Sequence, residues 1–323
     1  MREITYREAL NEALSEEMIR DENVFIMGED VGIYGGAYGV TKDLYNKFGE
    51  ERVRDTAISE AAIAGAAAGA AMMGMRPVAE IMYIDFSTIA LDAVANIAAK
   101  NRYMFGGKTT VPMVLRTEGG TGRGIAAHHS QSLEAMFAHF PGLYVVMPAT
   151  PHDAKGLLKE SIRNDSPVVF IEHKMLYGKK GAVPEQDYTI PIGKAELKRE
   201  GTDLTIITYS NMLYHSLEAA GKLSEEGISC EVVDLRTVKP VDIETVASSV
   251  EKTGRAIVVS EGYKTCGLAA EVMSLIVEHC FDYLDAPPVR IAGKDVPLPM
   301  SPVLEEAAIP RVIDIVEKAR EMV

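Results

Sequence analysis

Short apolar runs and longer amphipathic runs alternate along the chain. The short runs are rich in β-branched and aromatic residues and are typical of buried strands, whereas the longer runs repeat apolar residues at helical spacing. Strands that alternate with helices predict parallel, doubly wound sheets, so the expected fold class is α/β with two such domains. The predicted strands are 24–27, 77–83, 111–116, 143–148 and 167–172 in the first half, and 203–209, 230–235, 256–261 and 289–293 in the second.

The pattern breaks once, between the two halves. Residues 178–201 are rich in turn-forming and charged residues and show little helical periodicity. Such a change predicts a domain connection, because domain boundaries fall in exposed polar segments. We therefore expect a first domain over residues 1–185, a linker over 186–201 and a second domain over 202–323.

Two of the predicted helices have clear start signals. Thr5 and Glu8 have the spacing of a capping box. Thr150 and Pro151 with Asp153 combine an N-cap residue, a proline in the first turn and an acidic residue. The other predicted helices are 42–48, 87–104, 211–226, one from about 242, one from about 267 to 280, and 309–322.

The stretch 55–76, DTAISEAAIAGAAAGAAMMGMR, stands out in this pattern. Its apolar part is shorter than the roughly 20 residues that span a bilayer, which favours a buried helix with Ser59 as its N-cap. Gly65, Gly69 and Gly74 would each cost such a helix about 1 kcal/mol relative to Ala, which is reasonable if another backbone or a flat ligand approaches closely. Glu60 either complements the helix dipole or is a buried acid that hydrogen-bonds a ligand nitrogen.

Composition narrows the range of partners and locations. The 323 residues are 47% hydrophobic and 25% charged, as in ordinary soluble proteins, and the formal net charge is −14. That charge argues against a nucleic-acid partner and against an anionic membrane. The three cysteines are widely spaced and indicate neither a disulfide framework nor a zinc site. The charged N-terminal segment does not resemble a signal peptide, so we expect a cytoplasmic protein.

Several common chemistries have no motif here, and the remaining candidates lie in loops. There is no HExxH, no GxSxG and no complete GxGxxG. Ligands of open α/β sheets bind at the carboxyl ends of the strands, so residues near these ends are candidates. Histidines are candidates because the imidazole side chain titrates near neutrality. The candidates near such strand ends are Glu29, Glu60, the segment 81–86, and His128 and His129 at the end of the glycine-rich loop 118–132.

Nine segments, in a fixed order, make the sequence recognisable. They are GEDVG (28–32), RVRDTAISE (52–60), PVAEIMYIDF (77–86), RYMFGGK (102–108), HSQS (129–132), PGLYVVMPATPHDAKGLL (141–158), SPVVFIEHKMLY (166–177), DLRTVKPVD (234–242) and SPVLEEAAIP (301–310). With them, essentially the whole chain resembles the beta subunit of the thiamin-diphosphate-dependent component of 2-oxo acid dehydrogenase complexes. The resemblance implies a transketolase-like pyrimidine-binding domain followed by a transketolase C-terminal-like domain.

The resemblance also implies a cofactor and roles for several residues. Thiamin diphosphate acts as an ylid that attacks a carbonyl. Glu60 matches the family's glutamate that hydrogen-bonds the pyrimidine ring, and Glu29 matches an acid of the nearby proton network. His129 matches the histidine that faces the substrate and the lipoyl group, with His128 in a supporting role. The other implied cofactor contacts are Ile58, Met82, Ile84 and Phe86.

Metal sites and partners follow from the same resemblance. The chain has no GDG and no Asn-Asn pair, the sequences that hold Mg²⁺ and the diphosphate in thiamin enzymes. The implied assembly is therefore an α₂β₂ heterotetramer whose alpha subunit supplies that half of the site, docked to a dihydrolipoyl acyltransferase core. Asn164 stands where the family has an aspartate in a structural potassium site, and Ala57 where it usually has proline. The implied potassium ligands are Met113, Ser161, Ile162, Asn164 and Ser166.

The resemblance implies an oxidoreductase that acts on an oxo group with a lipoyl disulfide as acceptor and is active only with the alpha subunit. The expected reaction is the decarboxylation of a small 2-oxo acid such as pyruvate. Three segments, YMFGGK, ATPHDAKGLL and IEHKMLY, look most like acetoin dehydrogenase and related bacterial enzymes, whereas EGYKTCG (261–267) looks more like pyruvate dehydrogenase. An acetoin dehydrogenase beta subunit, a split transketolase C-terminal half and a non-catalytic subunit therefore stay open as alternatives.

Overall fold

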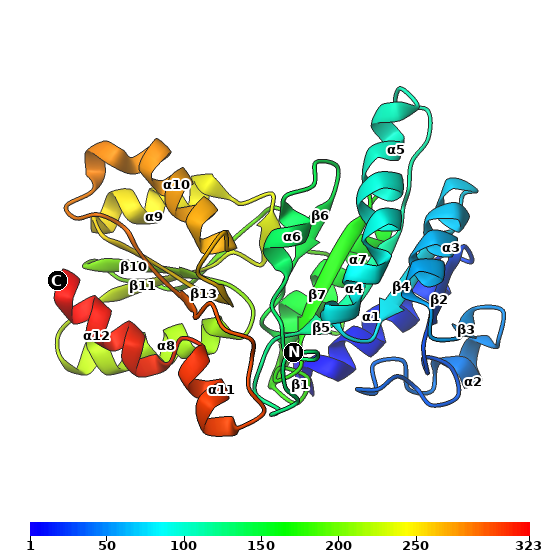
Figure 1. Ribbon diagram of the computed structural model, residues 1–323, viewed down its shortest axis with the longest axis horizontal. Coiled ribbons are helices and arrows are strands. Elements are labelled where there is room, and N and C mark those ends of the chain that lie inside the picture. The colour runs from blue at the N-terminus through cyan, green and yellow to red at the C-terminus, as the bar shows by residue number, and fades with distance from the viewer. The chain divides into compact units, whose positions relative to one another are not determined.

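The computed structural model describes residues 1–323 and divides into two compact units. The first unit contains residues 1–119 and 136–192, and the second contains residues 120–135 and 193–323. Each unit is built on its own mainly parallel sheet (Figure 1). The α/β fold class with two parallel-sheet domains is therefore confirmed, while the predicted linker at 186–201 and the boundaries beside it stay predictions.

The main sheet of the first unit is parallel throughout, with its strands in the order β6-β7-β5-β4-β2-β3. The five strands predicted for this half are present with shifted ends, and β3 was not predicted because three residues carry too little pattern. A separate antiparallel pair joins β1 (Arg2–Thr5) to β8 (Lys180–Val183). The parallel strands are β2 (Val24–Gly28), β3 (Val53–Asp55), β4 (Arg76–Ile81), β5 (Val114–Gly119), β6 (Tyr144–Val146) and β7 (Val168–His173).

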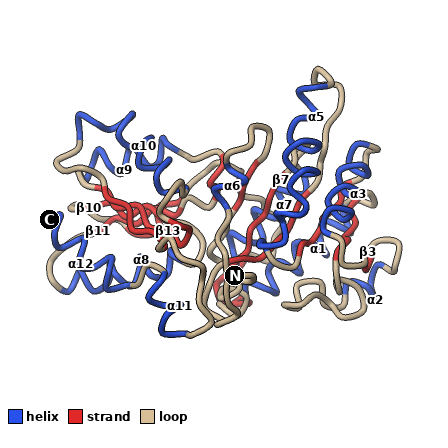
Figure 2. Tube along the Cα trace, in the orientation of Figure 1, coloured by secondary structure: helices blue, strands red, loops and turns tan.

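Two helices of this half begin at the capping residues that the sequence predicted. Thr5 forms the predicted capping box with Glu8 at the start of α1, and the Thr150 side chain accepts a hydrogen bond from the Asp153 amide at the start of α7. The predicted helix 87–104 is one helical column that ends with α5 (Figure 2). Residues Ala93–Ala98, between α4 and α5, form a π-helical turn. The helices are α1 (Tyr6–Arg20), α2 (Leu44–Phe48), α3 (Glu60–Met72), α4 (Ser87–Asp92), α5 (Ala99–Met104), α6 (Glu134–Ala138) and α7 (Pro151–Arg163).

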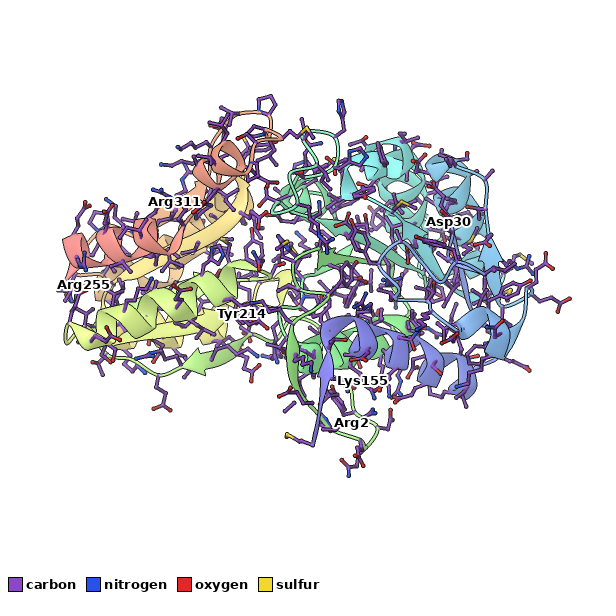
Figure 3. All side chains as sticks on the ribbon, turned by 90° about the horizontal axis from the view of Figure 1, so that it is seen from below. Arg2, Asp30, Lys155, Tyr214, Arg255 and Arg311 are labelled. Atoms are coloured by element: carbon purple, nitrogen blue, oxygen red, sulfur yellow. The ribbon has the colours of Figure 1, made fainter.

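A buried lysine on α7 pairs with two partly exposed carboxylates on α1. The ammonium group of Lys155 on α7 lies 3.1 Å from a carboxylate oxygen of Glu12 and 2.6 Å from one of Glu16, both on α1. Figure 3 shows Lys155 beside helix α1. Since an unpaired buried charge would be strongly unfavourable, these ion pairs fix how the two helices pack.

Helix α3 is the alanine-rich helix predicted from 55–76, and it begins where the sequence predicted. Ser59 occupies the predicted N-cap position, but its side chain makes no capping hydrogen bond. One face of the helix is buried through Ile63 and four alanines, Ala64, Ala67, Ala68 and Ala71. A Cβ added at Gly65 or Gly69 would meet nothing within 4 Å. The close approach expected at these glycines is therefore not made within the chain itself.

The second unit is a doubly wound sheet with strand order β14-β13-β10-β11-β9. All its neighbours are parallel except β9, which runs antiparallel at the edge. Helices α9 and α10 cover one face and α8 and α12 the other (Figure 1). The strands of this sheet are β9 (Glu196–Arg199), β10 (Leu204–Thr208), β11 (Cys230–Asp234), β13 (Ala256–Tyr263) and β14 (Val289–Gly293), and the unit also contains β12 (Thr237–Lys239), which is not part of this sheet. Its helices are α8 (Met212–Glu225), α9 (Ile243–Thr253), α10 (Leu268–Cys280), α11 (Pro302–Ala308) and α12 (Val312–Met322).

The second-half predictions omitted β9, β12 and α11, which are short and weakly patterned. None of the helices in either unit combines the length and the apolar character that a membrane span requires.

Candidate functional site

The carboxyl ends of β2, β4, β5 and β7 meet at one edge of the first unit's sheet. The strand register pairs Gly28 with Glu80, Ile81 with Thr117, and Glu118 with Glu172. This is the edge at which open α/β sheets bind their ligands. The candidate site of the first unit therefore contains an unusual concentration of carboxylates.

Glu29 and Glu60 lie near enough at this edge for the charge of one to act on the other. Glu29 directly follows β2, and the Thr56 amide donates a hydrogen bond to the Gly28 carbonyl (2.9 Å), which ties the segment before α3 to the end of β2. Glu60 is buried in the first turn of α3. Burial raises the pKa of Glu29, and the neighbouring charge of Glu60 raises it further. The Oε1 atom of Glu29 is buried without a hydrogen-bond partner, so the pair can accept a proton or a hydrogen bond from a ligand.

A narrow aromatic and acidic pocket lies at the same edge. It is lined by Tyr38, Met82, Arg116, Glu118 and Tyr177, among others. Tyr38 stacks on Tyr177, with ring centroids 4.8 Å apart, and donates a hydrogen bond to Glu118 Oε1 (3.2 Å). Burial raises the pKa of Glu118 to about 8, although the nearby ammonium of Lys174 lowers it.

Sequence reasoning missed this pocket. The available signal was the presence of charged residues, Arg116, Glu118 and Glu172, at the ends of strands that are otherwise apolar. Because a charge on a strand buried on both faces needs a partner, such residues predict a buried ion-pair network.

The residues expected to contact the pyrimidine ring have different environments. Met82 is half-buried and lines the pocket, and Phe86 is half-buried at the end of a 3₁₀ turn. Ile84 is fully buried in the chain. Ile58 is 81% exposed, in the loop before α3. The structure thus brings Met82, Glu29 and Glu60 to one edge, while the cofactor contacts themselves stay predictions.

His128 and His129 belong to the second unit, in the segment 120–135. His128 is exposed and His129 is half-buried. The His129 amide donates to the Ala126 carbonyl (3.3 Å), and Ala126 has a positive φ of 63°. The two histidines are thus carried by a tightly turned loop of a different unit from Glu29 and Glu60.

The predicted potassium ligands cluster around the end of α7. Ser161 and Ile162 lie in its last turn, Asn164 is its C-cap residue, and the Ser166 amide donates to Asn164 Oδ1 (2.9 Å). Met113 is buried just before β5. The guanidinium of Arg76 donates to the carbonyls of Ile162 (3.0 Å) and Asn164 (3.1 Å). A potassium ion bound here would share these carbonyls with Arg76, and the site stays a prediction.

Comparison with known families covers nearly the whole chain. The model of the transketolase pyrimidine-binding domain matches residues 2–180, and that of the transketolase C-terminal domain matches residues 193–315. The rice mitochondrial pyruvate dehydrogenase E1 component subunit beta-2 is 49% identical over 323 residues, covering 99% of this chain and 86% of the relative. The corresponding beta subunit of Rickettsia felis is 46% identical over 320 residues, covering 99% of this chain and 98% of the relative.

The chain belongs to the E1 beta-subunit family of 2-oxo acid dehydrogenases. The fold of this E1 beta-type chain is also that of transketolases. A solved structure described as a split-gene transketolase in an inactive beta4 tetramer has a TM-score of 0.82 at 24% identity, covering 99% of this chain and 98% of that one. Transketolase from Leishmania mexicana has a TM-score of 0.74 at 16% identity, covering 100% of this chain and 46% of that one. At these identities the likeness concerns the fold alone.

Proposed function

We propose that this chain is the beta subunit of a thiamin-diphosphate-dependent E1 enzyme, which decarboxylates a small 2-oxo acid such as pyruvate and transfers the acyl group to lipoyl-lysine. Relatives named as pyruvate dehydrogenase E1 beta subunits support this reaction class. The observation that carries the proposal is the carboxylate pair at the sheet edge, with buried Glu60 and the unpartnered Oε1 of Glu29.

This carboxylate pair fits an amino-pyrimidine ring. Thiamin diphosphate, when bound, supplies a nucleophilic carbon that attacks the substrate carbonyl. Glu60 would form a hydrogen bond with ring nitrogen N1′. Burial and then the neighbouring charge of Glu60 raise the pKa of Glu29, so Glu29 can hold a proton beside the ring. The proposed walls of the ring site are Ile58, Met82, Ile84 and Phe86.

In this proposal the two histidines interact with the substrate and the lipoyl group. His129 would orient the reacting substrate and the incoming lipoyl group, because a neutral imidazole can donate at one nitrogen and accept at the other. His128 supports it.

The proposal requires partner proteins. The chain has no GDG and no Asn-Asn pair, so an alpha subunit would hold Mg²⁺ and the diphosphate in an α₂β₂ heterotetramer. A dihydrolipoyl acyltransferase core would receive the acyl group. The potassium site and the cytoplasmic location belong to the same set of expectations.

An activity panel tests the function. The chain is co-expressed with an E1 alpha-type subunit, supplied with thiamin diphosphate and Mg²⁺, and assayed by reduction of an artificial electron acceptor. Pyruvate, branched-chain 2-oxo acids and acetoin are offered in parallel, with this chain alone as control. We expect turnover of a 2-oxo acid only when both chains are present. Turnover by this chain alone contradicts the two-chain site, turnover of acetoin alone supports the acetoin dehydrogenase alternative, and no turnover favours the non-catalytic alternative.

Sugar phosphates are added to the activity panel as substrates, because they test the alternative that this chain is a split transketolase half. A substrate phosphate needs free basic groups. At the edge of the first unit's sheet, the guanidinium of Arg116 is held by Glu80 (2.5 Å) and Glu172 (2.7 Å), so it does not serve a phosphate. We therefore expect no transfer to or from sugar phosphates.

A further inference from the structure

The glycine-rich loop that carries the histidines is held by two buried carboxylates of its own unit. The amide of Thr121 (2.6 Å) and its hydroxyl (2.9 Å) both donate to Glu261 Oε1, at the end of β13. The amide of Gly122 donates to Glu305 Oε1 (3.0 Å) and that of Gly124 to Glu305 Oε2 (3.1 Å). Glu305 lies on α11, so residues far apart in sequence meet at this loop.

The glycines make the contact to Glu305 possible. Gly122 and Gly124 have φ values of 102° and 62°, which side chains of L-amino acids rarely adopt. A Cβ at Gly124 would lie 3.0 Å from the carbonyl oxygen of Met300, so a side chain there would press against the segment before α11. With these turns, two nearby amides point at the two oxygens of one carboxylate, an arrangement that suits an anion.

The other end of the loop is anchored as well. The amide of Gly120 donates to the carbonyl of Gln131 (3.0 Å), which closes the base of the loop. The hydroxyl of Tyr209 donates to Glu134 Oε1 (2.7 Å) in the interior of the second unit. His128 and His129 lie between these anchors, so the conformation of the loop decides where their imidazoles point.

We propose that Glu305 is a positioning residue for His129, acting by binding the amides of Gly122 and Gly124. Each of its carboxylate oxygens accepts a charge-assisted hydrogen bond from the loop, and such bonds are about twice as strong as neutral ones. The consequence for turnover rests on the function proposed above, whereas the consequence for the loop does not.

The test compares three variants of the full chain, each co-expressed with the alpha-type subunit. Glu305→Ala removes both acceptors, and Glu305→Gln keeps the shape and one acceptor without the charge. Glu306→Gln is the matched control, because Glu306 is the exposed neighbour on the same helix. Hydrogen exchange of peptides covering 120–131 reports the loop, and peptides from β10 and β11 report whether the unit is folded.

We expect Glu305→Ala to speed exchange of the loop amides by about tenfold or more, with a smaller effect for Glu305→Gln and none for the control. Trypsin should cut after Arg123, which is exposed in this loop, faster in the Ala variant. The Gln variant keeps the test decisive if the Ala variant fails to fold. Unchanged loop exchange in a folded Glu305→Ala or Glu305→Gln chain overturns the proposal.

Kinetics separate positioning from general stability. If Glu305 positions His129, the Gln variant loses kcat/KM for the 2-oxo acid by about tenfold, while its affinity for thiamin diphosphate, measured by titration, stays within twofold of the unmodified chain. A loosened loop with unchanged kcat/KM overturns the link to His129. A loosened loop in a complex whose unmodified form turns over no 2-oxo acid contradicts the proposed function but supports the role of Glu305 in holding the loop.

Discussion

Arg116 and Glu172 face each other across neighbouring strands in a two-point ion pair, with Nε–Oε1 and Nη2–Oε2 distances of 2.7 and 2.8 Å. Both side chains are almost fully buried, and Tyr177 donates a further hydrogen bond to Glu172 Oε2 (2.7 Å). Burial would lower the pKa of Arg116, but the charges of Glu172 and Glu80 raise it, so the guanidinium stays charged. The carboxylates of the candidate site are therefore held around one fixed positive charge.

Replacement of Arg116 by Met should destabilise the first unit strongly. The change leaves Glu80 and Glu172 without their partner, and breaking a buried ion pair in this way costs about 3–5 kcal/mol. Thermal unfolding followed by circular dichroism measures the effect. Arg54→Met is the control, since Arg54 is exposed and its loss should change stability by less than about 0.5 kcal/mol. A similarly small loss of stability for both variants would show that the ion pairs of Arg116 do not stabilise this edge of the sheet.

The raised pKa of Glu118 makes the free energy of unfolding depend on pH. Its pKa in the folded chain is about 8, above the ordinary value of 4.5, so between these pH values the folded state binds more protons than the unfolded state. Its contribution to stability is fully present below pH 4.5 and is lost as the pH rises toward 8. Glu118→Gln should reduce the fall in unfolding free energy over this window, whose upper limit for one group is about 1.4 kcal/mol per pH unit.

Denaturant titrations at several pH values measure this slope. Glu51→Gln, at an exposed position, should leave it unchanged. An identical slope in the Glu118→Gln chain would mean that other carboxyls, such as Glu29 and Glu172, whose pKa values burial also raises, account for all of it.

Glu60→Gln should abolish turnover in the complex while assembly survives. An amide has the size of the carboxyl but cannot exchange a proton with a ring nitrogen, and loss of acid–base help costs about 10²–10⁴-fold in rate. Turnover is measured with the electron-acceptor assay, and light scattering checks that the complex still forms. Glu50→Gln, on the exposed surface before β3, is the control. Retained turnover in the Glu60→Gln complex would favour a non-catalytic subunit.

Two helix starts give a matched pair of stability predictions. The Thr150 hydroxyl accepts a bond from the Asp153 amide (3.1 Å) and donates to Asp153 Oδ2 (2.6 Å), so Thr150→Ala should cost about 1 kcal/mol. Ser59 holds the same position at α3 without a capping bond, so Ser59→Ala should change stability by less than about 0.5 kcal/mol. Equal losses, measured by thermal unfolding, would contradict the assignment of the two caps.

The predictions from sequence succeeded where a signal is local and failed where it is not. The capping box at Thr5, the start of α7 and the strand at 24–27 depend on neighbours within a few residues, and the structure confirms them. The strand pair β1–β8 and the edge strand β9 depend on partners distant in sequence. Their short segments carry little pattern of their own.

The candidate site shows the same division. Glu29 and Glu60 could be placed near strand ends because parallel strands bring their carboxyl ends together. The charge of Glu60 does raise the pKa of Glu29, while their shared role in one site stays a prediction. The pairing of Glu261 and Glu305 with the histidine loop could not be inferred, because backbone amides as hydrogen-bond donors leave no trace in the identity of the residues. The same holds for Arg76 on the carbonyls of Ile162 and Asn164.

The loop anchors have a consequence for biosynthesis. Glu261 leaves the ribosome 140 residues after Thr121, and Glu305 leaves it 183 residues after Gly122. Because chains fold as they are synthesised, the first unit's strands can pair while the histidine loop still lacks both carboxylates. A chain that stops before α11 therefore lacks the contacts of Glu305 with the loop that carries the histidines. Completing this loop thus requires helix α11 (Pro302–Ala308), which is encoded well after it.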